Sequence, residues 1–264
     1  MDLGLKGKVA LVLAASKGLG RASAQTLASE GASVVIGSRD KDALAQAAQD
    51  IEHASGSKVL PIPVDVTKPE ELEAFVAAAH RAFGRIDILV NNAGGPPVGT
   101  FDSFNDAQWQ AAFELTLLSV IRLTRLVLPS MRTTGSGRII NIVSTSVKQP
   151  IDNLLLSNAI RPAVIGLAKS LSNELAPDNI TVNNVCPGRI LTDRLLAGHH
   201  MQGQLAKGVS PQVVLDAIAQ DIPLKRLGKP EELASLVAFL ASEQAAYITG
   251  TTTQVDGGLV RSLF

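Results

Sequence analysis

The sequence predicts an α/β fold in which one doubly wound parallel sheet carries helices on both faces. Short runs rich in β-branched residues alternate with longer segments whose apolar residues recur every three or four positions. The short runs are mostly apolar throughout, as expected for strands that are covered on both sides. No linker rich in Pro, Gly or Ser interrupts the 264 residues, so we expect a single domain over residues 1–264.

Strands and helices are expected in regular alternation. The predicted strands cover residues 9–14, 34–38, 59–64, 86–91, 138–143, 181–186 and 252–255. A helix is expected from Arg21, and apolar stripes at helical spacing predict further helices within residues 72–83, 112–124, 164–175 and 233–240. Such βαβ units have right-handed crossovers, which place the strands parallel in one sheet. Residues 189–227 are the least regular stretch, and we expect them to form a lid-like insert.

The composition excludes several kinds of partner. Lys plus Arg and Asp plus Glu both number 24, so we expect neither a nucleic-acid-binding surface nor a polybasic membrane anchor. No apolar run is long enough to span a bilayer. The only cysteine, Cys186, rules out an internal disulfide or a multi-cysteine metal site and is typical of a reducing compartment. We therefore expect a cytoplasmic protein without a metal.

A glycine-rich turn follows the first predicted strand. It contains Ser16, Lys17, Gly18, Leu19 and Gly20 and precedes a predicted helix. Glycines let the backbone approach a ligand closely, and the N–H groups at the start of the helix face that ligand, so the arrangement predicts a pyrophosphate site. An ordinary turn between a strand and a helix would show a similar pattern. Its position after the first strand favours a dinucleotide cofactor.

The end of the second strand indicates which dinucleotide binds. An acidic residue there accepts hydrogen bonds from a ribose hydroxyl, whereas a cation there holds a 2′-phosphate. The sequence has Ser38 and Arg39 at this point, and Asp40 is placed as the N-terminal residue of a helix. Arg39 and Lys17 are able to hold a phosphate between them, which favours NADP over NAD. The alternative is that Arg39 is a solvated surface cation.

Further segments together resemble the short-chain dehydrogenase/reductase family. Asp65-Val66 follows the third strand, Asn91-Asn92-Ala93-Gly94 the fourth, and Pro187-Gly188-Arg189-Ile190-Leu191-Thr192 the sixth. Residues 223–232, 239–242, 247–250 and 255–258 are similar to the C-terminal half of that family. The resemblance covers residues 6–258, and the branch that the chain resembles is that of the 3-oxoacyl-acyl-carrier-protein reductases.

This resemblance implies a fold, a cofactor and a class of substrate. The implied fold is a Rossmann-type domain with a sheet of about seven strands. The implied cofactor is a nicotinamide dinucleotide, the substrate is a small carbonyl, an alcohol or a 3-oxoacyl thioester, and the assembly is a homotetramer or homodimer. The resemblance places the cofactor against Asp65, Val66, Asn92, Ala93, Gly94, Pro187, Gly188, Ile190 and Thr192.

The sequence departs from the family's pattern where the chemistry takes place. Ala14 replaces the first glycine of the cofactor turn. Ser144 stands where the family has a substrate-orienting serine, but Ser157 and Arg161 stand where it has its catalytic tyrosine and lysine. The asparagine that the family has in its fourth helix falls on Thr116.

These replacements change how a proton reaches the substrate. A serine hydroxyl donates a hydrogen bond to a developing oxyanion but is a far weaker acid than tyrosine. Arg161 lies one helical turn after Ser157, where it can hold ribose hydroxyls and add positive potential. A guanidinium stays charged, however, and cannot relay a proton. The only tyrosine, Tyr247, belongs to the C-terminal segments and cannot substitute.

Three outcomes stay open at this point. Water carries the proton, or Lys148 carries it, or the protein binds the nucleotide without turning over ordinary carbonyls. Two functions are therefore predicted. The first is an NADP-dependent oxidoreductase in which Ser144 and Ser157 hydrogen-bond the substrate oxygen and Arg161 holds the ribose. The second is a nucleotide-binding homologue with little or no reductase activity, which serves as a sensor or a subunit.

Overall fold

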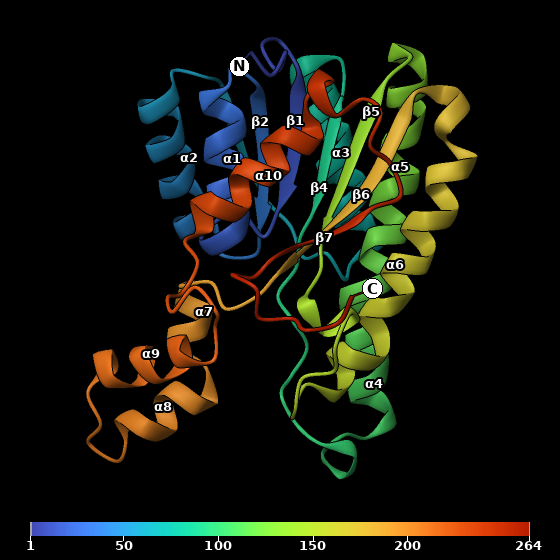
Figure 1. Ribbon diagram of the computed structural model, residues 1–264. Helices are drawn as coiled ribbons and strands as arrows, with labels where there is room; N and C mark the ends of the chain where they lie inside the picture. The colour runs from blue at the N-terminus through green and yellow to red at the C-terminus, as the bar shows by residue number, and fades with distance from the viewer. Residues whose placement is uncertain (1, 264) are drawn as a thin grey trace.

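The computed structural model describes residues 2–263, apart from the side chains of residues 199 and 200. Within these residues seven parallel strands form one sheet in the order β3-β2-β1-β4-β5-β6-β7 (Figure 1). The strands are β1 (Val9–Leu13), β2 (Ser33–Ser38), β3 (Val59–Pro63), β4 (Ile88–Asn91), β5 (Gly137–Ile142), β6 (Ile180–Pro187) and β7 (Thr252–Val255). The predicted doubly wound sheet is confirmed. Its strand order reverses between β1 and β4, where folds of this kind bind their ligands.

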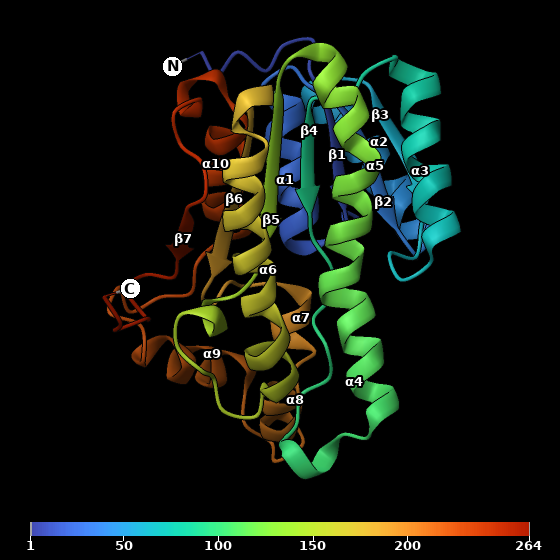
Figure 2. The ribbon, with the colours of Figure 1, turned by 90° about the vertical axis from the view of Figure 1, so that its right-hand side faces the viewer.

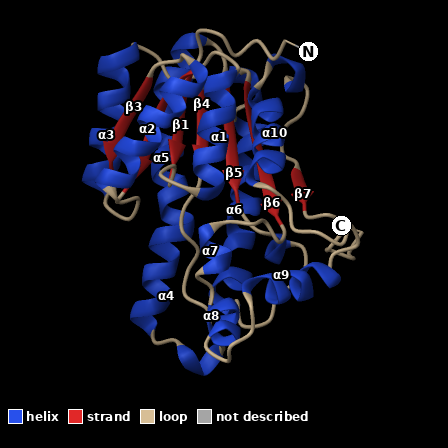
Figure 3. Ribbon diagram, turned by 90° about the vertical axis from the view of Figure 1, so that its left-hand side faces the viewer, coloured by secondary structure: helices blue, strands red, loops and turns tan. Residues whose placement is uncertain are grey.

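Helices cover both faces of the sheet because its central strands are apolar on both sides. One face carries α1 (Gly18–Ser29), α2 (Lys41–Ser55) and α10 (Pro230–Ala241), and the other carries α3 (Pro69–Phe83), α5 (Ser119–Thr134) and α6 (Leu155–Glu174) (Figure 3). In β1, Ala10 and Val12 belong to the first core, and Val9, Leu11 and Leu13 belong to the second. All of β1 is buried, which explains why its sequence does not alternate between apolar and polar residues.

A long helical column passes the carboxyl edge of the sheet. α4 (Asp106–Phe113) continues through a π-helical turn (Glu114–Leu118) into α5 (Figure 2). The helix predicted within residues 112–124 is confirmed, and it changes its winding at Glu114–Leu118. Turns of this type are frequent at functional sites.

The segment predicted as an insert also lies beyond the carboxyl edge. It carries α7 (Asp193–Leu196), α8 (His199–Leu205) and α9 (Pro211–Gln220) (Figure 1). Its two ends are joined, because the Gly228 N–H donates to the Arg189 carbonyl at 3.0 Å and the Leu191 N–H donates to the Gly228 carbonyl at 2.9 Å. That this segment moves as a lid stays a prediction. Within residues 2–263 no helix combines the length and the apolar character needed to cross a membrane.

Candidate active site

The turn between β1 and α1 is packed tightly around glycine. α1 begins at Gly18 rather than at the predicted Arg21, so Gly18 and Gly20 both lie in its first turn, where the backbone N–H groups have no partner within the helix. A Cβ at Gly20 would lie 2.8 Å from the carbonyl carbon of Ala14 and 2.9 Å from Nδ2 of Asn92. Contacts this short are not tolerated, so only glycine fits at this position.

Ala14 has a backbone conformation that favours glycine. Its φ is 49°, in the left-handed region. A residue with a Cβ is strained there by roughly 1–2 kcal/mol. This conformation fits the prediction that the family has a glycine at this position, and the alanine costs local strain.

Loops from two other strands reach this turn. Nδ2 of Asn92, after β4, donates to the Leu13 carbonyl at 3.3 Å. Thr192, after β6, lies over the helix start, since its methyl group would be 3.6 Å from a Cβ on Gly18. The motifs predicted to bind one cofactor thus meet at one edge of the sheet.

The ends of β2 and β3 lie beside the turn. The Ser38 hydroxyl donates to Oγ of Ser16 at 3.0 Å, and Arg39 is exposed. Asp40 caps α2, accepting from the Ala43 N–H at 3.1 Å, which is the helix-terminal position that the sequence predicts. The side chain of Asp40 therefore caps α2, and Arg39 is the charged side chain next to the end of β2.

Asp65 follows β3 and is held ionised. Its Oδ1 accepts from the N–H and the hydroxyl of Thr67, at 3.0 and 2.8 Å. Partial burial raises the pKa of this carboxyl, but the two Thr67 hydrogen bonds and the charges of Arg39 and Lys68 outweigh burial, so the pKa lies below its usual 3.8. Residues 14–20, 38–39 and 65–66 are called the glycine end of the site below.

The three serines of the opposite end form a chain of contacts. Ser144 follows β5, and its Oγ accepts from the Ser146 N–H at 3.1 Å, capping a short 3₁₀ turn (Thr145–Val147). Oγ of Ser146 lies 3.1 Å from Oγ of Ser157, which is buried in the first turn of α6. Ser157 thus has a hydroxyl partner that sequence analysis missed, because the contact depends on the fold of the 3₁₀ turn.

Arg161 lies one turn after Ser157 on α6, as predicted, and is buried. Its Nη1 donates to the Val143 carbonyl at 2.7 Å. Burial lowers the pKa of the guanidinium to about 10, and repulsion from Arg194 adds to this effect, so the group stays charged at neutral pH. Thr116, Ser144, Ser146, Ser157 and Arg161 are called the serine end.

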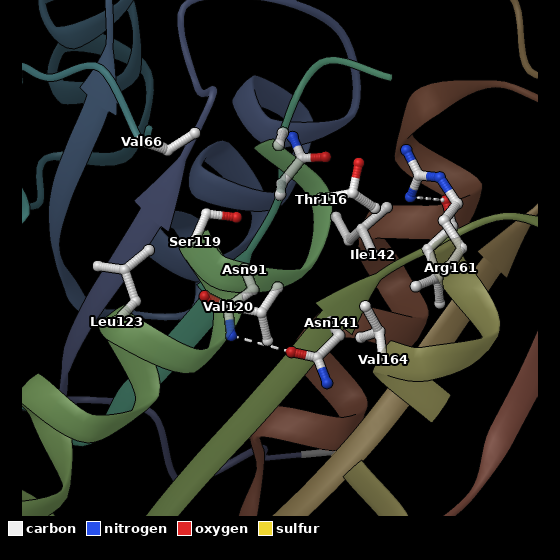
Figure 4. A pocket seen from close by; sticks show the side chains of 13 residues that line it. Val66, Asn91, Thr116, Ser119, Val120, Leu123, Asn141, Ile142, Arg161 and Val164 are labelled. Atoms are coloured by element: carbon white, nitrogen blue, oxygen red, sulfur yellow. Dashed lines mark hydrogen bonds between the residues drawn. The ribbon is translucent and has the colours of Figure 1, made fainter. Parts of the chain in front are cut away.

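A pocket lies between the two ends, lined by Val66 of the glycine end and Arg161 of the serine end (Figure 4). The predicted residues Asn92 and Ala93 line it too, whereas the glycine turn, Ser144 and Ser157 are not part of its lining. Thr116, in the π-helical turn, lines it too, and its buried Oγ1 makes no hydrogen bond within the described chain. Buried hydroxyls are normally hydrogen-bonded, so this oxygen is available to a ligand or water.

Buried amides cross the sheet beneath this pocket. Asn91 donates to Asn141 at 2.9 Å, Asn141 to Asn184 at 2.9 Å, and Asn184 to the Thr252 hydroxyl at 3.1 Å. These four side chains stand at matched positions of β4, β5, β6 and β7. Oδ1 of Asn91 makes no hydrogen bond in the described chain and belongs to a residue of the pocket lining (Figure 4). The row makes the pocket floor polar and rigid.

The remaining predicted residues have varied surroundings. Pro187 ends β6, and Ile190 is buried and bridges to Gly228. Gly188 must be glycine, since a Cβ there would lie 2.7 Å from Cα of Asp256. Lys17 is the N-cap residue of α1 and is exposed, and the side chain of Leu19 packs partly into the core. Gly94 lies near Arg194, whose Nη1 would be 3.9 Å from a Cβ at that glycine.

The sequence contains three other titratable groups with a conceivable role at the site. Tyr247 is fully exposed and lies outside the pocket lining. Cys186 is buried, as expected, and burial raises the pKa of its thiol to about 11. Lys148 lies close enough for its charge to act on that thiol. Lys148 therefore stays a candidate proton carrier.

Comparison with known proteins covers nearly the whole chain. A family model described as enoyl-(acyl carrier protein) reductase matches residues 13–260. The chain is 40% identical to a 3-oxoacyl-[acyl-carrier-protein] reductase of Vibrio cholerae, with 97% of this chain and 99% of that protein covered. It is 36% identical to an NADPH-dependent reductase of Bacillus subtilis, over 97% of this chain and 99% of that protein. An L-sorbose reductase from Gluconobacter frateurii, solved with NADPH and L-sorbose, superimposes with a TM-score of 0.96 at 38% identity, and each chain is fully covered. These relatives are all reductases, and they give no support to a homologue without activity.

Proposed function

We propose that this chain, which belongs to the short-chain dehydrogenase/reductase family, reduces a carbonyl group with NADPH in the pocket between the glycine end and the serine end. One observation carries the proposal. The glycine turn, the loops after β4 and β6, and Ser157 with Arg161 all meet at the carboxyl edge of one sheet, at the point where its strand order reverses. Parallel α/β sheets bind nucleotides at this point.

The residues at the glycine end fit such a cofactor. Gly20 lets the start of α1 pack tightly against Ala14 and Asn92, and the free N–H groups of this helix start would face a bound diphosphate. Ser16, Ser38, Arg39 and Lys17 would surround a 2′-phosphate, which is why we propose NADPH rather than NADH. The proposed cofactor contacts are Ser16, Lys17, Gly18, Leu19, Gly20, Ser38, Arg39, Asp65, Val66, Asn92, Ala93, Gly94, Arg161, Pro187, Gly188, Ile190 and Thr192.

At the serine end, we assign the chemistry to Ser144, Ser157 and Arg161. Bound NADPH supplies the hydride. The Ser157 hydroxyl can accept a hydrogen bond from Ser146 and donate its own proton to the substrate oxygen, because the two Oγ atoms lie 3.1 Å apart. Ser144 accepts a backbone N–H, which leaves its hydroxyl proton free to donate as well. Two such donors, aimed where negative charge develops, stabilise the transition state.

Arg161 contributes charge rather than a proton. It stays protonated at neutral pH, since its pKa is about 10. Its fixed position, with Nη1 on the Val143 carbonyl, places positive potential beside Ser157 and leaves other N–H groups for ribose hydroxyls. The proton itself comes from water or from Lys148. Without a positioned tyrosine, we expect a rate about 10²–10⁴ below that of an enzyme with one.

The proposed substrate is a small carbonyl compound or a 3-oxoacyl thioester. The thioester is suggested by the relatives named as 3-oxoacyl-[acyl-carrier-protein] reductases. A homotetramer or homodimer and a cytoplasmic location stay predictions from the family resemblance and the composition.

The test combines NADPH binding with turnover. The purified protein is titrated with NADPH and is then assayed for loss of NADPH absorbance with a panel of carbonyls that includes 3-oxoacyl thioesters. We expect saturable binding and slow turnover of at least one substrate. NADPH binding without turnover of any substrate would contradict the proposed reductase activity. The absence of NADPH binding would contradict the proposed cofactor as well.

Two variants test the roles within the serine end. Arg161→Ala should weaken NADPH binding more than Ser157→Ala, because only Arg161 is assigned to the ribose. Ser157→Ala should mainly lower kcat. Equal losses of NADPH affinity in the two variants would show that Arg161 does not hold the ribose.

A further inference from the structure

Two arginines carry like charge beside the pocket, and neither has an acidic partner among the described residues. Arg161 is only 9% exposed, and among charged groups Arg194 on α7 acts on it most strongly. None of the ion pairs between described residues involves either arginine. The carboxylate of Asp256, whose charge acts on Cys186 as that of Arg161 does, accepts hydrogen bonds from the N–H groups of Gly258 and Val260, both at 2.9 Å.

The Arg161 guanidinium has hydrogen-bond donors without a partner in the described chain. Of its guanidinium nitrogens, Nη1 donates to the Val143 carbonyl, and the others make no hydrogen bond within the described chain. Arg161 lines the pocket, and its guanidinium lies at the same end of it as Thr116 (Figure 4). A buried cation with unused donors is costly unless an anion or a polar ligand approaches it.

Arg194 reaches the site from the other side. Its guanidinium lies against the loop after β4, where a Cβ on Gly95 would be 2.9 Å from Cζ and 3.0 Å from Nη1 of Arg194. Gly95 thus leaves the space that the guanidinium fills. The side chain of Arg194 makes no hydrogen bond with any described residue, and partial burial lowers its pKa. Arg194 is exposed as a residue, but its guanidinium packs against this loop and its donors are free.

Two like charges that face the same space repel each other, and an anion between them would remove this repulsion. The planar fork of arginine matches the oxygens of a carboxylate or a phosphate. We propose that Arg161 and Arg194 together bind an oxyanion group, phosphate or carboxylate, at the serine end. Because Arg194 belongs to α7, binding of the anion would also fix the segment of residues 189–227 over the site.

Two molecules could bring this oxyanion, and the inference about them rests on the proposed function. One is the cofactor, whose diphosphate would lie near Thr192, just before Arg194 in the chain. The other is a substrate that carries a carboxylate close to its carbonyl group, such as a 3-oxo acid. A neutral thioester would leave both arginines without an anion if the cofactor does not provide it.

The first experiment needs no catalytic activity. Inorganic diphosphate is added to the wild-type protein and to Arg194→Ala, with sodium chloride at equal ionic strength as the reference, and the thermal midpoint Tm is measured. Lys207→Ala is the control, because it removes an exposed cation from the same segment. We expect diphosphate to raise Tm of the wild type and of Lys207→Ala, and this rise to be clearly smaller in Arg194→Ala, where only the turn at Gly18–Gly20 would still bind the anion.

The second experiment distinguishes the two sources. If the cofactor brings the anion, Arg194→Ala should weaken NADPH binding by roughly 10-fold or more, as expected for a lost charged hydrogen bond. If the substrate brings it, NADPH binding should stay unchanged, and KM should rise by about the same factor for acetoacetate but not for its methyl ester. Lys207→Ala should change neither quantity.

A second variant distinguishes loss of the anion site from loss of the fold. Gly95→Ala keeps both charges but pushes the Arg194 guanidinium away, so it should show the same loss as Arg194→Ala at unchanged cooperativity of unfolding. The proposal is overturned if Arg194→Ala and Lys207→Ala match the wild type in the diphosphate shift, in NADPH affinity and in KM for acetoacetate. A diphosphate shift that depends on Arg194 in a protein that binds no NADPH would keep the anion site and reject the proposed function.

Discussion

The glycine end and the serine end of one pocket are built in different ways. At the glycine end the backbone shapes the site, with a helix start, close packing at Gly20 and a left-handed residue at position 14. At the serine end side chains shape it, with three hydroxyls and a buried arginine on loops and helix starts. The family resemblance predicts that the pattern is kept at the first end except at Ala14, whereas at the second it predicts departures at Thr116, Ser157 and Arg161.

This difference shows which part of the site can change without changing the fold. A site shaped by the backbone depends on close packing, and Ala14 adopts a left-handed conformation there although it carries a Cβ. A site that is shaped by side chains tolerates substitutions as long as the polar groups of the new side chains are hydrogen-bonded or face the pocket. Binding of a dinucleotide is therefore expected to persist, whereas the chemistry at the serine end is free to diverge.

The largest effect is expected at the glycine end from Gly20→Ala. The added methyl collides with the Ala14 carbonyl carbon and with Nδ2 of Asn92, so we expect NADPH binding to be abolished and stability to fall by about 1–3 kcal/mol. NADPH titration and urea unfolding measure both effects. Gly166→Ala is the control, because a Cβ at this exposed helix position meets nothing within 4 Å and should stabilise the protein slightly. Wild-type binding in Gly20→Ala would show that the turn is not the diphosphate site.

Arg161→Met should separate stability from binding at the serine end. Burial lowers the pKa of Arg161 to about 10, so the buried charge destabilises the folded state by roughly 3 kcal/mol. Loss of the hydrogen bond to Val143 offsets part of this gain, so stability at neutral pH should rise by about 1 kcal/mol. NADPH affinity should fall at least about tenfold if the ribose contact is lost.

Urea unfolding and NADPH titration test this prediction, and Arg161→Lys is the matched control that keeps a cation. A less stable Arg161→Met protein with unchanged affinity would mean that the arginine is structural. The serine end would then not be a site whose side chains can be exchanged without loss of stability.

Ala14→Gly should relieve the strain at the glycine end. Removing the methyl frees a residue at φ 49°, but glycine also loses more conformational freedom on folding, so we expect a net gain of about 0.5–1 kcal/mol. Chemical unfolding measures the gain. Ala15→Gly in the same turn, at a position with no positive φ, should destabilise instead. Equal losses in both variants would argue against strain at position 14.

The smallest effect is expected from Asp65→Asn. The folded pKa of Asp65 lies below 3.8, so the carboxylate stabilises the fold above its unfolded pKa, and this contribution is lost as the pH falls through the folded pKa. The wild type should be more stable than the variant by a few tenths of a kcal/mol at neutral pH, since the group is partly exposed. The difference should vanish in acid. A difference that grows toward low pH would contradict this sign.

Much of this architecture could be predicted from the sequence because local patterns determine it. Apolar runs without alternation predict buried parallel strands, and the positions of Gly18 and Gly20 predict the turn. The contacts of Ser146 and Arg194 could not be predicted, because neither residue belongs to a recognisable pattern. Ser146 meets Ser157 only through a 3₁₀ turn, and Arg194 reaches Gly95 only because two loops far apart in sequence meet at one edge of the sheet. The π-helical turn at Thr116 leaves no periodic signal either.

A crystal structure of the protein with NADP⁺ tests the central claim most directly. The account predicts the diphosphate against the N–H groups of Gly18–Gly20, the ribose of the nicotinamide in contact with Arg161, and the ring beside Ser144 and Ser157. A nucleotide bound elsewhere, or a pocket that stays closed by its own side chains at saturating NADP⁺, would contradict it.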